Sequence, residues 1–207
     1  MHQKRIITAG KSLSEAAKVL IMVHGRGGYA EGILSLADQL NVKDYALLAP
    51  QATNQSWYPY SFLAPPESNE QWLTSALEIL KEMVNDLVSS GTSKENIYFL
   101  GFSQGACLTL EFVTRNAEKY GGVAAFTGGL IGDKIYNENY TGDFSGTPVF
   151  IGSSDPDPHV PVERVNATAE ILEKMNASVI KKIYKDMGHT ISLDEIQLAN
   201  QHVFQTS

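Results

Sequence analysis

Cysteine is almost absent from this 207-residue chain, and basic residues are in the minority. The single cysteine, Cys107, cannot form an intramolecular disulfide or a thiolate metal cluster, so nothing indicates a disulfide-stapled secreted scaffold. The chain has 16 lysine and arginine residues against 23 aspartate and glutamate residues, a net charge of −7. We therefore expect no nucleic-acid partner, because nucleic acids bind to basic protein surfaces.

The sequence also lacks a hydrophobic run long enough to span a membrane. Its apolar stretch at residues 19–23 has the size of a buried strand. Lys4 and Arg5 precede an apolar run that is too short for a secretory signal peptide. We expect a cytoplasmic protein with no stable membrane insertion, folded as one globular domain over residues 1–207.

Short β-branched runs alternate with amphipathic stretches along the chain, which is typical of an α/β fold with a mostly parallel sheet between helices. The expected strands cover residues 19–24, 45–49, 97–101, 122–127, 147–152 and 178–184, with a weaker edge strand at 3–8. Apolar stripes predict helices over 33–40 and 72–87, and further helices begin after Pro161 and at Ser192, where Glu195 completes a capping box. Gly121 and Gly122 are expected to end the helix that follows position 103.

Two connections are longer than a compact fold needs: residues 55–69 and residues 128–146. Long ordered loops are usually functional. The first is rich in aromatic residues and proline. Its aromatic side chains either wall an apolar pocket or cover an edge of the core, and the sequence leaves both interpretations open.

One pentapeptide, Gly101-Phe102-Ser103-Gln104-Gly105, is the most informative segment of the chain. It lies between an apolar run and a helix-forming run, the context of a nucleophile elbow, in which a strand turns sharply into a helix. Such a turn strains its apex residue and needs small flanking residues. It holds the serine hydroxyl clear of the sheet, in front of the positive end of the helix dipole. Ser103 is therefore the predicted nucleophile.

A serine hydroxyl needs a base to accept its proton and an acid to orient that base. Both candidates follow Ser103 in the order acid, then histidine. His189 follows the strand expected at 178–184, whereas Asp155 and Asp157 both follow the strand expected at 147–152 and compete for the role of the acid. With His159 these aspartates also allow a metal site, but carboxylate-rich turns before helices are common caps, so we expect no metal.

Four further histidines compete with His189. His2 is terminal and His202 falls in the last helix, so both are expected on the surface. His24 lies in a glycine-rich turn at the end of the strand expected at 19–24, where the turn presents a backbone N–H to an oxyanion and the histidine side chain is structural. His159 neighbours the candidate acids. His189 is the predicted base.

Several segments together resemble the phospholipase/carboxylesterase group of small, lidless α/β-hydrolases, which includes the acyl-protein thioesterases. They extend from about position 20 to position 190 and are His24-Gly25-Arg26-Gly27, Ser56-Trp57-Tyr58, Gly101 to Gly105, Asp155-Pro156-Asp157-Pro158-His159-Val160-Pro161, and Gly188-His189. The resemblance implies an α/β-hydrolase fold, with a mostly parallel central sheet, helices on both faces and no separate lid domain.

The resemblance also implies roles for individual residues. Register on the Asp-Pro-x-Val-Pro motif assigns the acid to Asp157 and leaves Asp155 as its polar neighbour. The oxyanion N–H groups are then those of Arg26 and Gln104. The implied activity is hydrolysis of a carboxylic ester or thioester through an acyl-enzyme on Ser103, which needs neither a metal nor an organic cofactor.

The candidate substrate contacts are Trp57, Tyr58, Arg26 and His159. Two departures from the family pattern bear on the site: Ser153-Ser154 replaces the usual His-Gly, and Arg26 replaces an aliphatic residue. The Arg26 side chain either offers a cation at the pocket mouth, which suits an acidic group on the substrate, or points to solvent while only its backbone N–H acts.

Two other functions compete with ester hydrolysis. One is a non-catalytic α/β-hydrolase scaffold that binds a ligand or partner, although such proteins usually lose a residue of the triad. The other is a dienelactone-type hydrolase for ring-cleavage products, although the usual cysteine nucleophile is missing. The sequence leaves open the acyl chain length, the choice between ester and thioester, and homodimer formation.

Overall fold

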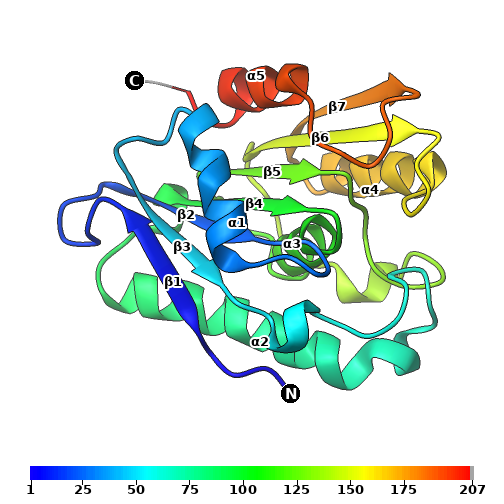
Figure 1. Ribbon diagram of the computed structural model, residues 1–207, viewed down its shortest axis with the longest axis horizontal. Helices are drawn as coiled ribbons and strands as arrows, with labels where there is room; N and C mark the ends of the chain where they lie inside the picture. Colours follow the sequence, from blue (N-terminus) through cyan, green and yellow to red (C-terminus); the bar gives the residue numbers. More distant parts are fainter. Residues whose placement is uncertain (206–207) are drawn as a thin grey trace.

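A computed structural model, which describes residues 1–205, places seven strands in one sheet with helices on both faces (Figure 1). The strands are β1 (Ile6–Gly10), β2 (Lys18–Val23), β3 (Tyr45–Pro50), β4 (Ile97–Phe102), β5 (Gly122–Phe126), β6 (Pro148–Asp155) and β7 (Ser178–Lys185). The helices are α1 (Ala30–Leu34), α2 (Pro66–Ser89), α3 (Gln104–Arg115), α4 (Val162–Lys174) and α5 (Leu193–His202), together with short 3₁₀ turns. The spatial order is β1-β3-β2-β4-β5-β6-β7, and every pair is parallel except β1 with β3.

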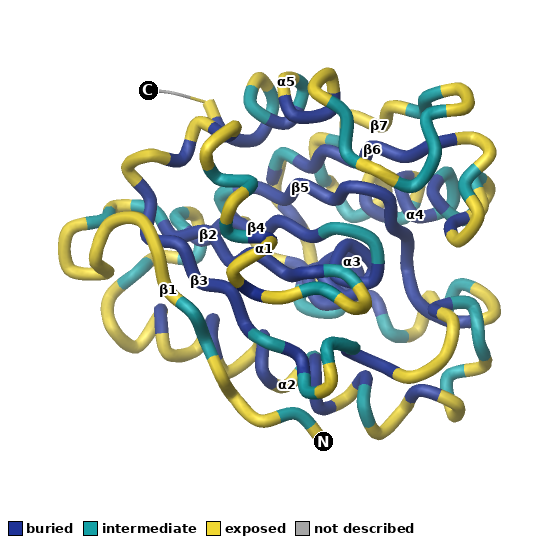
Figure 2. Tube along the Cα trace, in the orientation of Figure 1, coloured by how far each residue is buried: buried dark blue, intermediate teal, exposed yellow. Residues whose placement is uncertain are grey.

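Side chains of the central strands alternate between two hydrophobic cores. In β2, Val19 and Ile21 pack with α2, α3 and α4, whereas Leu20 and Met22 pack with α1 and α5. Figure 2 shows the central strands buried along their length, as expected when helices cover both sides of a parallel sheet. This double burial is the reason that these strands appear in the sequence as continuous apolar runs. The α/β architecture expected from the sequence, a mostly parallel central sheet with helices on both faces, is confirmed.

Every expected strand is present, but several local boundaries differ from the prediction. The helix expected over 72–87 begins at Pro66, so the first long connection ends at Pro65 and not at Asn69. The edge strand lies at residues 6–10 and not at 3–8, because it pairs antiparallel with β3 in that register. The helix expected over 33–40 ends at Leu34 and continues as a 3₁₀ turn over Ser35–Gln39. The helix α3 ends at Arg115 and not at Gly121, a glycine that lets the chain pass the Tyr98 ring, where a Cβ would overlap it.

The two long connections both pack against the body of the protein. In the first, Trp57, Tyr58 and Phe62 are buried. The second is held by Glu111 of α3, whose Oε2 accepts hydrogen bonds from the Ile131 N–H and the Tyr140 hydroxyl. Within residues 1–205, the helices are too short or too polar to cross a membrane.

The candidate residues converge because parallel strands end at the same edge of the sheet. Ser103 follows β4, Arg26 follows β2, Asp157 follows β6 and His189 follows β7 (Figure 1). The carboxyl edge of a parallel α/β sheet is the usual location of a binding site. The topology alone therefore brings together residues that are up to 163 positions apart in sequence, since Arg26 and His189 both border one cleft.

Candidate active site

Ser103 occupies a strained turn between β4 and α3. Its φ of 55° and ψ of −121° lie in a region that non-glycine residues rarely adopt. Its N–H donates to the Phe126 carbonyl at 2.9 Å, which fixes the turn against the end of β5. The flanking glycines are required sterically: a Cβ on Gly101 would overlap the Gly105 backbone, and a Cβ on Gly105 would overlap the Val23 carbonyl. The strain expected for a nucleophile elbow is present.

Ser103, His189 and Asp157 form a chain of hydrogen bonds. The Ser103 Oγ lies 2.7 Å from His189 Nε2, and His189 Nδ1 lies 2.9 Å from Asp157 Oδ2. Because the carboxylate only accepts hydrogen bonds, His189 Nδ1 carries a proton, which leaves Nε2 of the neutral ring to accept one from the serine hydroxyl. The Asp157 side chain is fully buried and that of His189 is 20% exposed, so the serine end of the chain faces the solvent.

Asp157 is held in its ionised form by the turn that carries it. Burial alone raises the pKa of a carboxyl group, but here two backbone N–H groups and His189 outweigh burial, and the pKa of Asp157 lies below its usual range. The two backbone donors are His159 and Val160, both 2.8 Å from Oδ1. The side chain of Asp155 is exposed, while its carbonyl accepts the N–H of Asp186. Of the two candidate acids, Asp157 is the one that contacts His189.

Ser154 links the turns that carry the acid and the histidine. Its buried hydroxyl donates to the Pro156 carbonyl at 3.1 Å and accepts the Gly188 N–H at 3.0 Å. The sequence marks Ser153-Ser154 as a departure from the family pattern, but it does not reveal this bridge. The signal that points to it is a polar residue near the end of a buried strand, shortly before the acid.

The backbone N–H groups of Arg26 and Gln104 are available to a ligand. Within residues 1–205 neither N–H donates to another protein group. Gln104 is the first residue of α3, so its N–H lies at the positive end of the helix dipole. The turn that carries Arg26 lies against Ser103, since a Cβ on Gly25 would lie 3.3 Å from the Ser103 Cβ.

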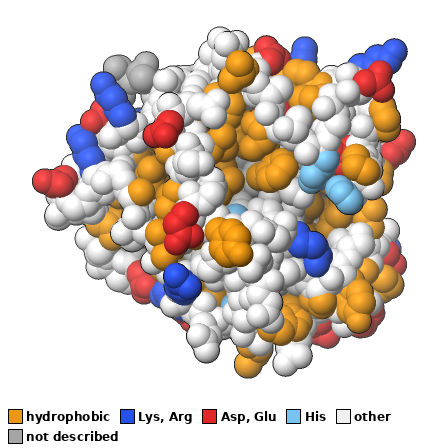
Figure 3. Space-filling model, viewed as in Figure 1, with side chains coloured by type: hydrophobic (Ala, Val, Ile, Leu, Met, Phe, Trp, Pro, Cys, Tyr) orange, Lys and Arg blue, Asp and Glu red, His pale blue; other side chains and the backbone are white. Residues whose placement is uncertain are grey.

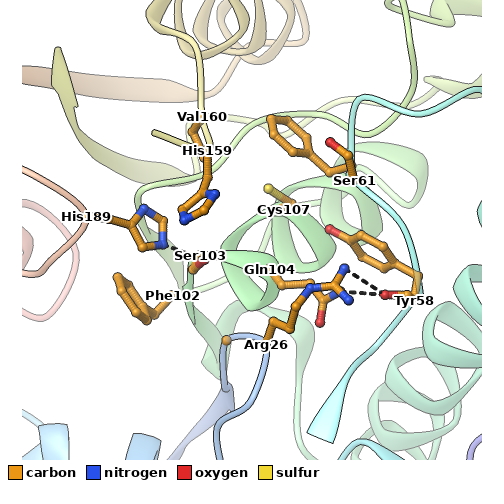
Figure 4. A pocket seen from close by; sticks show the side chains of 12 residues that line it. Arg26, Tyr58, Ser61, Phe102, Ser103, Gln104, Cys107, His159, Val160 and His189 are labelled. Carbon is orange, nitrogen blue, oxygen red and sulfur yellow. Dashed lines mark hydrogen bonds between the residues drawn. The ribbon is translucent and has the colours of Figure 1, made fainter. Parts of the chain in front are cut away.

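A cleft of about 330 Å³ opens in front of Ser103. Residues that line it include Arg26, Tyr58, Ser61, Phe62, Phe102, Cys107, His159, Val160 and His189 (Figure 4). On the molecular surface, histidine side chains lie beside hydrophobic ones and near a basic side chain (Figure 3). Of the candidate substrate contacts, Tyr58, Arg26 and His159 border this cleft, and the His159 ring packs edge to face on His189 with centroids 4.8 Å apart.

The prediction that Trp57 contacts substrate is not supported. Trp57 is fully buried and is not among the residues that line the cleft. Its indole N–H donates to the His24 carbonyl and its backbone N–H donates to the Gln104 side chain. These bonds turn the ring into the core, so Trp57 supports the cleft from behind.

The Arg26 side chain is exposed at the edge of the cleft, but it does not stand free there. Its guanidinium donates to Ser56 Oγ and to the carbonyls of Tyr58, Pro59 and Tyr60. These distances lie between 2.7 and 3.0 Å. The cation is therefore fastened to a neighbouring loop.

His2 and His24 both accept hydrogen bonds from backbone N–H groups. His24 Nε2 accepts the Ala52 N–H and His2 Nδ1 accepts the Thr53 N–H, each at 3.1 Å. Burial lowers the pKa of both rings, although their bonds to backbone carbonyls oppose the shift. The structural role expected for His24 is present. His2, which was expected on the surface, is only partly exposed, and its ring packs against Trp57.

Cys107 is buried at the inner end of the cleft. Burial raises the pKa of its thiol to about 12. A thiol with this pKa is almost fully protonated near neutral pH, and the thiolate is the reactive form. The structural interpretation of Cys107 therefore fits its surroundings.

Comparison with known proteins gives a consistent result. A family model described as Phospholipase/Carboxylesterase matches residues 4–207. The crystal structure of a phospholipase/carboxylesterase from Dyadobacter fermentans is 54% identical, covers 99% of this chain and 98% of that chain, and has a TM-score of 0.97.

Curated relatives include acyl-protein thioesterases of two yeasts. Acyl-protein thioesterase 1 of Kluyveromyces lactis is 34% identical over 60% of this chain and 56% of its own length. Acyl-protein thioesterase 1 of Saccharomyces cerevisiae is 26% identical over 89% of this chain and 91% of its own length. The chain spans only 48% to 56% of the length of the first curated relatives it matches.

Proposed function

The chain belongs to the phospholipase/carboxylesterase family, and from this premise we propose that it hydrolyses a carboxylic ester or thioester through an acyl-enzyme on Ser103. The observation that carries the proposal is the hydrogen-bonded chain from Ser103 through His189 to Asp157 at the edge of an open cleft. Relatives named as carboxylesterases and acyl-protein thioesterases support the reaction class.

Acylation begins when His189 Nε2 removes the hydroxyl proton of Ser103 as the oxygen attacks the substrate carbonyl. A bond forms between Oγ and the carbonyl carbon, and the carbonyl oxygen becomes an oxyanion. The imidazolium is stabilised by the Asp157 carboxylate, whose lowered pKa keeps it charged. His189 then gives the proton to the alcohol or thiol that leaves.

The oxyanion is held by the free N–H groups of Arg26 and Gln104. Donors of this kind stabilise the developing charge because they are fixed before the reaction begins, and each contributes roughly 3 kcal/mol in comparable sites. Hydrolysis of the acyl-enzyme repeats the sequence with water as the nucleophile. His189 deprotonates the water, and the Ser103 oxygen leaves with the returned proton.

The size of the cleft favours a short acyl group. A volume of about 330 Å³ lies at the lower end of the range for ligand pockets, roughly 300 to 1,000 Å³. Its apolar lining by Tyr58, Phe62, Phe102 and Val160 suits a hydrocarbon chain. A small ester or a short-chain thioester is therefore the proposed substrate class.

Steady-state hydrolysis of p-nitrophenyl esters of increasing chain length tests this proposal. Wild-type protein should cleave the acetate and butyrate esters faster than the dodecanoate. Ser103→Ala and His189→Ala should each lose at least about a thousandfold in kcat/KM with unchanged circular dichroism, because triad residues act as a unit. A Ser103→Ala variant that keeps near wild-type turnover would rule out the assignment.

A further inference from the structure

The two proposed oxyanion donors share an unusual relationship. Both use their side chains to hold the same short segment, residues 56–60, which we call the 56–60 segment. Arg26 donates from Nη1 to Ser56 Oγ and the Pro59 carbonyl, and from Nη2 to the carbonyls of Tyr58 and Tyr60. Both terminal nitrogens of the guanidinium are thereby fully used as donors.

Gln104, the first residue of α3, also binds the 56–60 segment through its side chain. Its Oε1 accepts the Trp57 N–H at 2.9 Å, and its Nε2 donates to the Tyr58 carbonyl at 2.8 Å. The Tyr58 carbonyl is therefore shared by Gln104 and Arg26. Figure 4 shows the Arg26 side chain reaching across to this carbonyl, while the side chain of Gln104 approaches from α3.

The turn that carries Arg26 is rich in glycine and is closed by one hydrogen bond of its own, from the Gly28 N–H to the Gly25 carbonyl at 3.0 Å. It contains Gly25, Gly27 and Gly28, and Gly27 has a φ of 74°. Glycine leaves a backbone with more conformational freedom than any other residue, so this turn needs external bonds to present one fixed N–H. Besides the Arg26 side chain, the Gly27 N–H contributes by donating to the Gln55 carbonyl at 2.7 Å.

The charge of Arg26 is not committed to an acidic partner. Among residues 1–205 no carboxylate forms an ion pair with its guanidinium. Although Arg26 is exposed, both terminal nitrogens of its guanidinium are held by hydrogen bonds to the 56–60 segment. Its planar fork spreads its donors over separate atoms in a fixed plane, whereas the three donors of a lysine ammonium all lie on a single atom.

We propose that the Arg26 side chain is a positioning residue for the oxyanion hole and not a substrate-binding cation. By holding the 56–60 segment that Gln104 also holds, it fixes the backbone N–H groups of Arg26 and Gln104 relative to each other. The expected effect of Arg26 on catalysis rests on the proposed function. The expected effect of Arg26 on the 56–60 segment rests on the hydrogen bonds alone.

The kinetic test uses Arg26→Met and Arg26→Lys, which keep the backbone N–H and the aliphatic stem. Both should lower kcat for p-nitrophenyl butyrate by roughly 10- to 100-fold, because a small misplacement of a catalytic donor costs about that much. KM should change by less than about threefold, since KM reports substrate binding that does not require the oxyanion. Arg5→Ala, which removes an exposed arginine from β1's amino-terminal flank, is the matched control and should behave as wild type.

Butylboronic acid separates positioning from substrate contact. It forms a tetrahedral adduct on an activated serine, so its inhibition constant should rise in Arg26→Met by about the factor lost in kcat/KM.

Phenyl acetate and 4-acetoxybenzoate are a matched neutral and anionic pair of esters. A positioning role predicts equal losses for both. A loss confined to KM for 4-acetoxybenzoate would overturn the inference in favour of a substrate-binding cation.

Amide hydrogen exchange tests the inference independently of activity. Arg26→Met should raise exchange at residues 56–60 at least tenfold, while exchange in β4 and β5 stays as in wild type. Unchanged exchange at 56–60 would overturn the inference even in an active enzyme. Conversely, a wild-type protein that cleaves no ester but shows the exchange effect in Arg26→Met would refute the proposed function and leave the structural role of Arg26 intact.

Discussion

The Ser154 hydroxyl accepts the Gly188 N–H at 3.0 Å and thereby joins the turn of the proposed acid to the turn of the proposed base. Ser154 lies in β6, where it pairs with Tyr184 of β7, and Gly188 lies in the turn that follows β7. Asp157 and His189 lie beyond the last residues that these strands pair, in two turns without strand pairing. The Ser154 hydroxyl links these two turns from the end of the sheet.

Removing the Ser154 hydroxyl should weaken both folding and catalysis. Ser154→Ala removes the hydrogen bonds to the Gly188 N–H and the Pro156 carbonyl, and for partly buried groups each such bond contributes about 1 kcal/mol. Urea unfolding should show the loss in stability, and ester hydrolysis should show a lower kcat because His189 is held less firmly.

The neighbouring Ser153 provides a matched control. Its hydroxyl is buried but lacks a partner within residues 1–205, so Ser153→Ala should be neutral or stabilising. Equal effects of the two substitutions would contradict the role of the bridge.

The two aspartates of the 155–157 turn should differ sharply in their effect on turnover. Asp157→Asn keeps the shape of the side chain but removes the charge that stabilises the imidazolium and favours the wrong tautomer of His189, so kcat should fall by about 10⁴-fold. Asp155→Asn changes an exposed side chain and should stay within about twofold of wild type. Measured kcat values for p-nitrophenyl acetate decide the matter, and the reverse ranking would move the role of the acid to Asp155.

Stability should decline on mild acidification because of His2 and His24. Burial lowers the pKa of both rings in the folded protein, so the folded state binds fewer protons than the unfolded state below the ordinary histidine pKa of about 6.5. The stabilisation is therefore complete above that pH and is lost as the pH falls toward the folded values. Protonation also removes the ring acceptors for the Ala52 and Thr53 N–H groups.

Thermal unfolding at pH 7 and pH 5 measures this effect. His2→Gln replaces the ring with a group that does not titrate, and it should reduce the difference in Tm between the two pH values. His202→Gln is the control, because the His202 ring donates to the Ser178 carbonyl and that bond survives protonation. An unchanged difference in His2→Gln would show that the His2 ring does not contribute to the acid sensitivity.

Cys107 should resist alkylation in the folded protein. With a thiol pKa of about 12, only about one molecule in 10⁴ carries the thiolate at pH 8. Iodoacetamide at pH 8 should therefore leave native protein unmodified by mass spectrometry and add one carbamidomethyl group in urea. Rapid alkylation without urea would show that the thiol is exposed or activated, and would reopen a role for Cys107 in the cleft.

Much of the fold could be predicted from local sequence pattern. The strands of the central sheet are buried on both faces, so each appears as a short apolar run whatever its neighbours are. The pentapeptide around Ser103 is equally local, because the glycines at 101 and 105 are required by backbones that pass the same turn. The position of His189 followed from chain order, which the parallel topology converts into proximity.

What the sequence did not reveal depends on which surfaces meet in three dimensions. Trp57 and Tyr58 are adjacent aromatic residues in one loop, yet only Tyr58 borders the cleft, because the Trp57 indole finds an acceptor in the core at the His24 carbonyl. The partners of Arg26 are mostly backbone carbonyls, which every residue possesses, so no residue pattern marks them. His2 was misplaced for the same reason: nothing near position 2 indicates that residue 53 will offer it an N–H.

The intact mass after reaction with a fluorophosphonate shows whether His189 activates the Ser103 hydroxyl for covalent attack. We expect one adduct per chain, located on Ser103 by peptide mapping, and at least a hundredfold slower labelling of His189→Ala at equal concentration. Labelling of His189→Ala at the wild-type rate, or an adduct on another residue while Ser103 stays unmodified, would contradict this expectation.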